Sequence, residues 1–150
     1  MRKIRQFLPE ILLGILLVGA VLVPILVFRG PKPIFRYARI RDESFETVLY
    51  ELREDNTLRV RTGVSYEVLK LSHDHFLMHT DSDKLFALDG AESTRLVGLL
   101  RQLLSAHKPG DSREEDGGEW SESVFYNDRF YIWDAHGNAL ADALSAYIAE

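Results

Sequence analysis

Two histidines in the middle of the chain have the spacing of metal ligands. Residues 72–79 read SHDHFLMH, so on a strand the side chains of His73 and His75 share one face. Two imidazoles at that spacing can bind one zinc or other transition-metal ion if a third ligand converges on them. His79 is roughly 20 Å from His73 along a strand, which is too far for both to bind the same ion. We favour the simpler interpretation, a strand with a solvated polar face, and expect no cofactor.

Aromatic side chains are concentrated near the C-terminus. They are Trp120, Phe125, Tyr126, Phe130, Tyr131 and Trp133. Alternate rings of a β-hairpin point to opposite faces, so one set belongs to the core. The other set, Phe125, Tyr131 and Trp133, is the candidate exposed surface for a protein partner. The alternative is that helices cover both faces of the hairpin.

Other patterns that carry chemistry are missing from the sequence. There is no GxSxG elbow, no GxxxxGK[ST] loop and no GxGxxG turn, and the acids of residues 111–122 lack the EF-hand spacing. With no cysteine, disulfides and thiolate metal sites are excluded. We therefore expect a protein that is not an enzyme.

The N-terminal part of the chain has the composition of a membrane anchor. Ile11–Phe28 is a run of 18 residues without a charge, which as a helix spans roughly 27 Å. We expect a basic tail at 1–7, a transmembrane helix at 8–28 and a Pro-rich linker at 29–36. A cleaved signal peptide is the alternative, but eight apolar residues follow the Val18-Gly19-Ala20 cleavage-like site.

Charge is divided unevenly along the chain. Residues 1–36 carry a net charge of +5 and residues 37–150 carry −10. The candidate contacts to anionic headgroups are Arg29, Lys32 and Arg36, and the acidic remainder argues against a nucleic-acid partner. The basic residues after the span favour a cytoplasmic domain. Because long domains translocate largely regardless of charge, we lean to the extracytoplasmic side.

Residues 37–150 are expected to form one soluble domain. Alternating patterns predict strands at Ile34–Arg41, Thr57–Thr62, Tyr66–Leu71, His75–Thr80 and Lys84–Leu88, followed by a hairpin at Ser123–Tyr126 and Arg129–Asp134 around Asn127-Asp128. Helical periodicity predicts Gly90–His107, capped by Asp89, and a final helix capped by Asn138. Ser44–Arg53 fits both a helix and a strand, Gly63 is expected to end a strand, and 108–122 reads as an acidic surface loop.

Segregated strands and helices predict an α+β fold. The expected architecture is an N-terminal transmembrane helix followed by a two-layer domain, with an antiparallel sheet and two packed helices. The expected function is a membrane-anchored, non-catalytic binding or assembly module. Its expected partners are the lipid bilayer and another membrane or membrane-proximal protein. The alternatives are a small metal-dependent hydrolase that uses His73 and His75, and a carrier of lipid or another small ligand.

Overall fold

The computed structural model describes residues 30–41, 43–65, 79–107, 120–134 and 137–149. The chain divides into two compact units, Met1–Lys32 and Pro33–Glu150, and every element below belongs to the second unit. Within the described ranges, no helix is long and apolar enough to cross a membrane. The expected span at 8–28 lies outside these ranges, and so does the expected strand Tyr66–Leu71.

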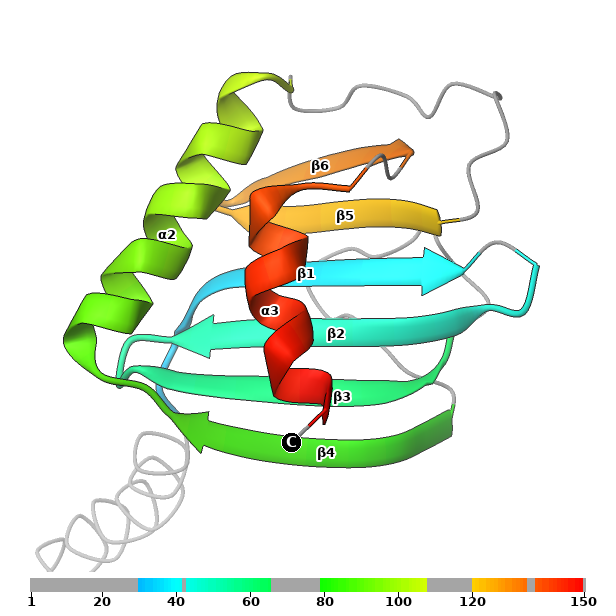
Figure 1. Ribbon diagram of the computed structural model, residues 1–150, viewed down its shortest axis with the longest axis horizontal. Coiled ribbons are helices and arrows are strands. Elements are labelled where there is room, and N and C mark those ends of the chain that lie inside the picture. The colour runs from blue at the N-terminus through cyan, green and yellow to red at the C-terminus, as the bar shows by residue number, and fades with distance from the viewer. Residues whose placement is uncertain (1–29, 42, 66–78, 108–119, 135–136, 150) are drawn as a thin grey trace, which may run out of the picture. The chain divides into compact units, whose positions relative to one another are not determined.

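Over the described residues, six antiparallel strands form one sheet beside two helices, so the domain is α+β as the sequence predicts. The strands are β1 (Pro33–Arg41), β2 (Glu46–Arg53), β3 (Thr57–Val64), β4 (His79–Ala87), β5 (Trp120–Tyr126) and β6 (Arg129–Asp134). Their order across the sheet is β4-β3-β2-β1-β5-β6. The first strand is therefore central, and β4 and β6 are the edges (Figure 1).

Both helices lie on the same face of this sheet (Figure 1). They are α2 (Gly90–Ser105) and α3 (Ala139–Ala149). Their apolar stripes pack on the rings and branched chains of alternate strand positions, which supply most of the hydrophobic stabilisation. The fully buried members of this core include Phe35, Tyr37, Tyr50, Leu52, Leu58, Leu96, Leu100, Val124, Leu140 and Leu144. The other face of the sheet also carries buried residues, among them Ala38, Ile40 and Leu49.

The expected helix caps and hairpin turn are confirmed. The carboxylate of Asp89 accepts the backbone N–H of Glu92 at 2.7 Å, and the Asn138 side chain accepts that of Ala141 at 2.8 Å. The turn residues Asn127 and Asp128 both have positive φ, 51° and 57°, which a two-residue hairpin turn of this type requires. Each of these features depends only on residues a few positions apart.

The ambiguous segment Ser44–Arg53 folds as strand β2. It pairs with β1 on one side and with β3 on the other. Both faces of β2 are then buried, with Tyr50 and Leu52 in the core beneath the helices and Leu49 on the opposite face. Two ladders of hydrogen bonds and burial on both sides outweigh the local helical pattern.

Two expectations about strand boundaries are wrong. Gly63 does not end a strand, because β3 continues to Val64 and only its register with β4 shifts between Thr62 and Gly63. The separate strands expected near 75–80 and 84–88 are, over the described residues, a single strand, His79–Ala87.

The expected loop and linker are shorter than the sequence suggests. Trp120, Ser121 and Glu122 belong to β5, and Glu122 is fully buried rather than part of an acidic surface loop. β1 begins at Pro33, and Phe35 is buried, so the sheet includes the last residues of the expected linker. The remaining loop residues, 108–119, lie outside the described part of the chain.

Candidate functional site

A groove follows α2 where the helix crosses one end of the sheet. Here the start of β1 meets the β2–β3 turn and the β5–β6 turn (Figure 1). One part of the groove is a pocket of about 480 Å³ between α2 and the β5–β6 turn. Its lining consists of Arg101, Leu104, Ser105, Tyr126, Asn127, Arg129 and Tyr131.

A second pocket continues the groove toward the start of α2. It measures about 350 Å³ and shares Arg101 with the first, so the two pockets are neighbours. The rest of its lining is Ile34, Asn56, Ser93, Thr94, Val97 and Gly98. The Ser93 hydroxyl is buried and has no hydrogen-bond partner within the described structure. We call the two pockets together the α2 groove.

Two arginines of the α2 groove differ from most others in the domain. Among the described residues, ion pairs to carboxylates occupy Arg36, Arg39, Arg41, Arg53, Arg59 and Arg95. No carboxylate of the described residues lies within ion-pair distance of Arg101 or Arg129. Arg101 donates a hydrogen bond from Nε to the Tyr126 hydroxyl at 3.1 Å, which links α2 to the end of β5. The α2 groove therefore presents two positive charges that the described fold does not neutralise.

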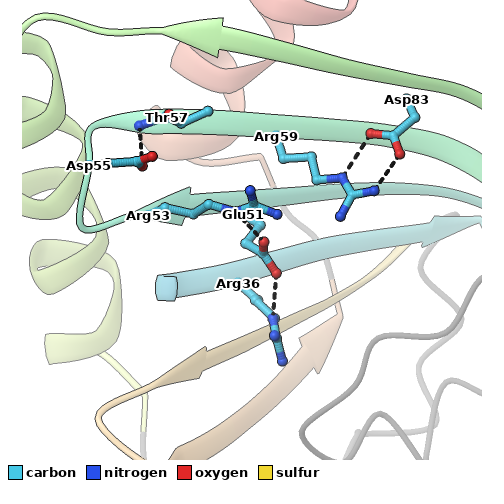
Figure 2. A network of polar contacts seen from close by, with 7 residues as sticks. All are labelled: Arg36, Glu51, Arg53, Asp55, Thr57, Arg59 and Asp83. Carbon is cyan, nitrogen blue, oxygen red and sulfur yellow. Dashed lines mark hydrogen bonds and ion pairs between the residues drawn. The ribbon is translucent and has the colours of Figure 1, made fainter. Parts of the chain in front are cut away.

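The sheet face opposite the helices carries a network of paired charges (Figure 2). Glu51 on β2 accepts hydrogen bonds from Arg36 Nε at 2.8 Å and from Arg53 Nε at 2.7 Å. On the neighbouring strands, Asp83 accepts from Arg59 Nε at 2.8 Å. The Arg36–Glu51 pair joins β1 to β2 and the Arg59–Asp83 pair joins β3 to β4, so we assign the network to sheet stability.

Acid is expected to weaken this network. Burial by itself would raise the pKa of Glu51, but the hydrogen bonds and positive charges of Arg36 and Arg53 outweigh it and lower the pKa. The hydrogen bond from Arg59 lowers the pKa of Asp83 in the same way. Carboxylates with a lowered pKa stabilise the fold above their unfolded-state pKa, roughly 4, and this stabilisation is lost as the pH falls through the folded-state value.

We therefore expect Glu51→Gln to lower the free energy of unfolding by about 2 kcal/mol at pH 7. The difference from the natural chain should shrink as the pH falls below about 4, because Glu51 is protonated first in the unfolded state and in the folded state only as the pH approaches its lowered pKa. Urea denaturation at pH 7 and pH 3, followed by tryptophan fluorescence, measures both effects. An equal loss at the two pH values would contradict this account of Glu51.

The buried Glu122 lies at the centre of a second network, beneath the start of α3. Its Oε2 accepts hydrogen bonds from Trp133 Nε1 at 2.9 Å and from Asn138 Nδ2 at 2.7 Å. Its Oε1 is 3.2 Å from Arg39 Nε, an ion-pair distance, although neither atom makes a hydrogen bond in the described structure. Burial, with the nearby charge of Glu122, raises the pKa of Tyr37 well above its ordinary range. We assign this network to the docking of α3 on the sheet.

The three aromatic residues proposed to bind a partner do not share a face. Phe125 is opposite Phe130, whereas Tyr131 is opposite Val124, which belongs to the core. Tyr131 is buried, and Trp133 stacks on His107 and donates its N–H to Glu122. The expected grouping is wrong because a two-residue turn pairs odd positions of β5 with even positions of β6. A role for any one of these rings in partner binding stays a prediction.

The metal and membrane-surface residues are placed only in part. His73, His75 and Arg29 lie outside the described residues. Elsewhere, in the ranges that the structure covers, no three His, Asp or Glu side chains are grouped as metal ligands. Lys32 is exposed, but Arg36 belongs to β1 and is paired with Glu51, so it is not a linker cation. Contact of Arg29, Lys32 and Arg36 with headgroups stays a prediction.

Sequence reasoning did not single out the α2 groove. Arg101 and Arg129 are 28 positions apart in the sequence and carry no motif. Comparison with known proteins adds no family: no family model matches the chain, and no curated protein matches it. The interpretation of the groove therefore depends on its own geometry.

Proposed function

We propose that this chain is a single-pass membrane protein whose domain is a non-catalytic binding module with the α2 groove as its binding site. The observation that carries the proposal is the placement of Arg101 and Arg129 in one pocket without a carboxylate partner among the described residues. Arg101 donates one hydrogen bond, to Tyr126, and no carboxylate of the described residues neutralises either arginine. Both charges can therefore contribute more to binding an anion than to stability, because a charge contributes most when it gains a partner of opposite sign.

The buried carboxylates of the domain support a binding role over acid–base chemistry. Glu51 is held by two arginines, and Glu122 contacts an arginine, an indole N–H and an amide. Groups with such contacts connect strands and helices and are not poised to exchange protons with a substrate. A tether would add to binding by raising the local concentration of the domain near a membrane ligand.

A carrier of lipid or another small ligand is the second candidate. The half of the α2 groove near Ile34, Val97 and Gly98 favours it, because these residues form an apolar strip beside the charged half, with Asn56, Ser93 and Thr94 completing the lining. Such a division is typical of sites that bind molecules with an apolar body and a polar end.

Photo-crosslinking of the full-length chain in its native membranes tests the proposal. A photoreactive residue at Gly98, in the groove, is compared with one at Ala146, which is exposed on α3. We expect discrete adducts at Gly98 that are missing at Ala146. The same adducts at both positions would contradict a role for the groove.

Membrane residence is tested with the same preparation. The chain should stay in the pellet after alkaline carbonate extraction, and the double substitution L16K/L17K in the apolar run should release it, because charges at mid-span oppose insertion. Recovery of the unsubstituted, uncleaved chain in the supernatant would overturn the anchor.

A further inference from the structure

We propose that the α2 groove binds a phosphate group carried on an apolar stem, with the phosphate at Arg101 and Arg129 and the stem along Ile34 and Val97. This inference rests on the proposed function for the location of the site. It adds the chemical class of the ligand, which an arginine pair alone does not define.

The charged half of the groove has the donors that a phosphate needs. The Nε of Arg101 is engaged with Tyr126, and no described residue accepts a hydrogen bond from its two terminal nitrogens. Guanidinium groups bind phosphate oxygens through two parallel N–H bonds, and Arg129 provides a second such group across the pocket. Asn127, in the turn, also lines the pocket, and an asparagine side chain can donate through its amide.

Acidic side chains do not line either half of the groove. The residues around the two pockets include two arginines and no aspartate or glutamate. Asp128 is in the same turn as Asn127, but it is exposed and does not line the pocket. An anion in the pocket would therefore meet two positive charges without a carboxylate in the lining to repel it.

The other half of the groove fits an apolar stem. It begins at Arg101 and continues along α2 past Gly98 and Val97 to Ile34 at the start of β1. A Cβ atom added to Gly98 would meet no atom within 4 Å, so the groove is open at this point of the helix. Burial of a hydrocarbon stem there would add to the binding free energy in proportion to the apolar area covered.

The domain follows the expected membrane span closely in the sequence, so a lipid headgroup is one source of such a phosphate. Only residues 29–32 separate the expected membrane span from β1, and a segment of four residues covers at most roughly 14 Å. A soluble phosphorylated molecule is the other source. Both share the phosphate chemistry, and the experiment below separates them.

The test uses the full-length chain in dodecyl maltoside and follows backbone amide NMR signals of Gly98 and Arg129. The ligands are dihexanoyl phosphatidic acid, glycerol 3-phosphate and dihexanoyl phosphatidylcholine. We expect saturable shifts with phosphatidic acid and weaker binding of glycerol 3-phosphate, which has no stem. Phosphatidylcholine should bind less well than phosphatidic acid, because its choline group carries a positive charge next to the phosphate.

Three variants identify the groups responsible. Combining Arg101→Gln with Arg129→Gln should weaken phosphatidic acid binding by about tenfold or more. Gly98→Leu should weaken phosphatidic acid but leave glycerol 3-phosphate unchanged. Arg95→Gln is the matched control, since Arg95 is exposed on the same helix and already paired with Glu92. It should bind as the natural chain does.

Several results would overturn the inference. They are the absence of saturable shifts with phosphatidic acid, equal binding of phosphatidic acid and phosphatidylcholine, and an equal loss of binding in the Arg95 control and the double variant. Equal affinity for glycerol 3-phosphate and phosphatidic acid would overturn the apolar stem and identify a soluble phosphorylated ligand. If Gly98 still forms its specific adducts in membranes while no phosphate ligand binds, the inference fails and the proposed function stands.

Discussion

Replacing Glu122 by leucine is expected to lower the free energy of unfolding by about 3–5 kcal/mol. The substitution removes the ion-pair partner of Arg39 and the acceptor shared by the indole N–H of Trp133 and the amide of Asn138. Removing one partner of a buried network costs more than the network itself contributes, because the remaining polar groups stay desolvated. Asn138 is also the N-cap of α3, so the loss should extend to the docking of that helix.

Glu122→Gln should have a smaller effect than Glu122→Leu. An amide oxygen can still accept the bonds from Trp133 and Asn138, but the negative charge beside Arg39 is lost. The matched control is Glu46→Leu on β2, where the carboxylate is also paired with an arginine but is 59% exposed. Its effect should be within about 0.5 kcal/mol.

Urea denaturation of the full-length chain in detergent measures these effects. Both tryptophans, Trp120 and Trp133, lie in β5 and β6 close to Glu122, so their fluorescence reports on the region directly. An effect of Glu122→Leu no larger than that of Glu46→Leu would contradict a structural role for the buried carboxylate.

Gly63→Ala is expected to destabilise the domain by about 3 kcal/mol. An added Cβ at Gly63 would overlap the carbonyl oxygen of His79 and lie 2.9 Å from its carbonyl carbon. Both atoms belong to the backbone of β4, so no side chain can rotate out of the way. The strand must shift instead, at the point where the β3–β4 register is already irregular.

Gly98→Ala provides the comparison, because the same substitution there should have the opposite sign. Gly98 lies inside α2 with no atom within 4 Å of an added Cβ, and alanine is a better helix former by roughly 1 kcal/mol. Thermal or urea unfolding of both variants tests the pair. A Gly63→Ala chain as stable as the natural one would show that β4 does not approach Gly63 as described.

Several local features could be predicted because they depend on neighbours in the chain. Asp89 and Asn138 cap helices through residues three positions away, and Asn127-Asp128 forms its turn from its own backbone preferences. The leucine stripe of α2 likewise follows from a helical period, and Leu96 and Leu100 are buried as it requires. These signals also indicate the α+β class.

The candidate site could not be predicted, because it joins segments that are far apart in the sequence. Arg101 and Arg129 line the same pocket only because α2 crosses the end of the sheet beside the β5–β6 turn. An exposed arginine on a helix and another after a turn have the same local sequence signal as any solvated cation. The burial of Glu122 could not be predicted for a similar reason, since its acidic neighbours in the sequence resemble a surface loop. Glu122 is two positions before Val124, a residue of the core, so on a strand the two side chains share a face. This spacing is the signal that could have indicated a buried Glu122.

By itself the sequence determined an uncharged, apolar N-terminal run, the class of the domain, its helix caps and its hairpin turn. Only the tertiary structure decided that residues 46–53 form a strand, that β1 is central between β2 and β5, and that Glu122 is buried. The physical reason is the separation in sequence between the residues that interact. Caps, turns and periodicity involve residues within a few positions, whereas strand order, register and buried charge pairs depend on contacts between segments that chain closure brings together.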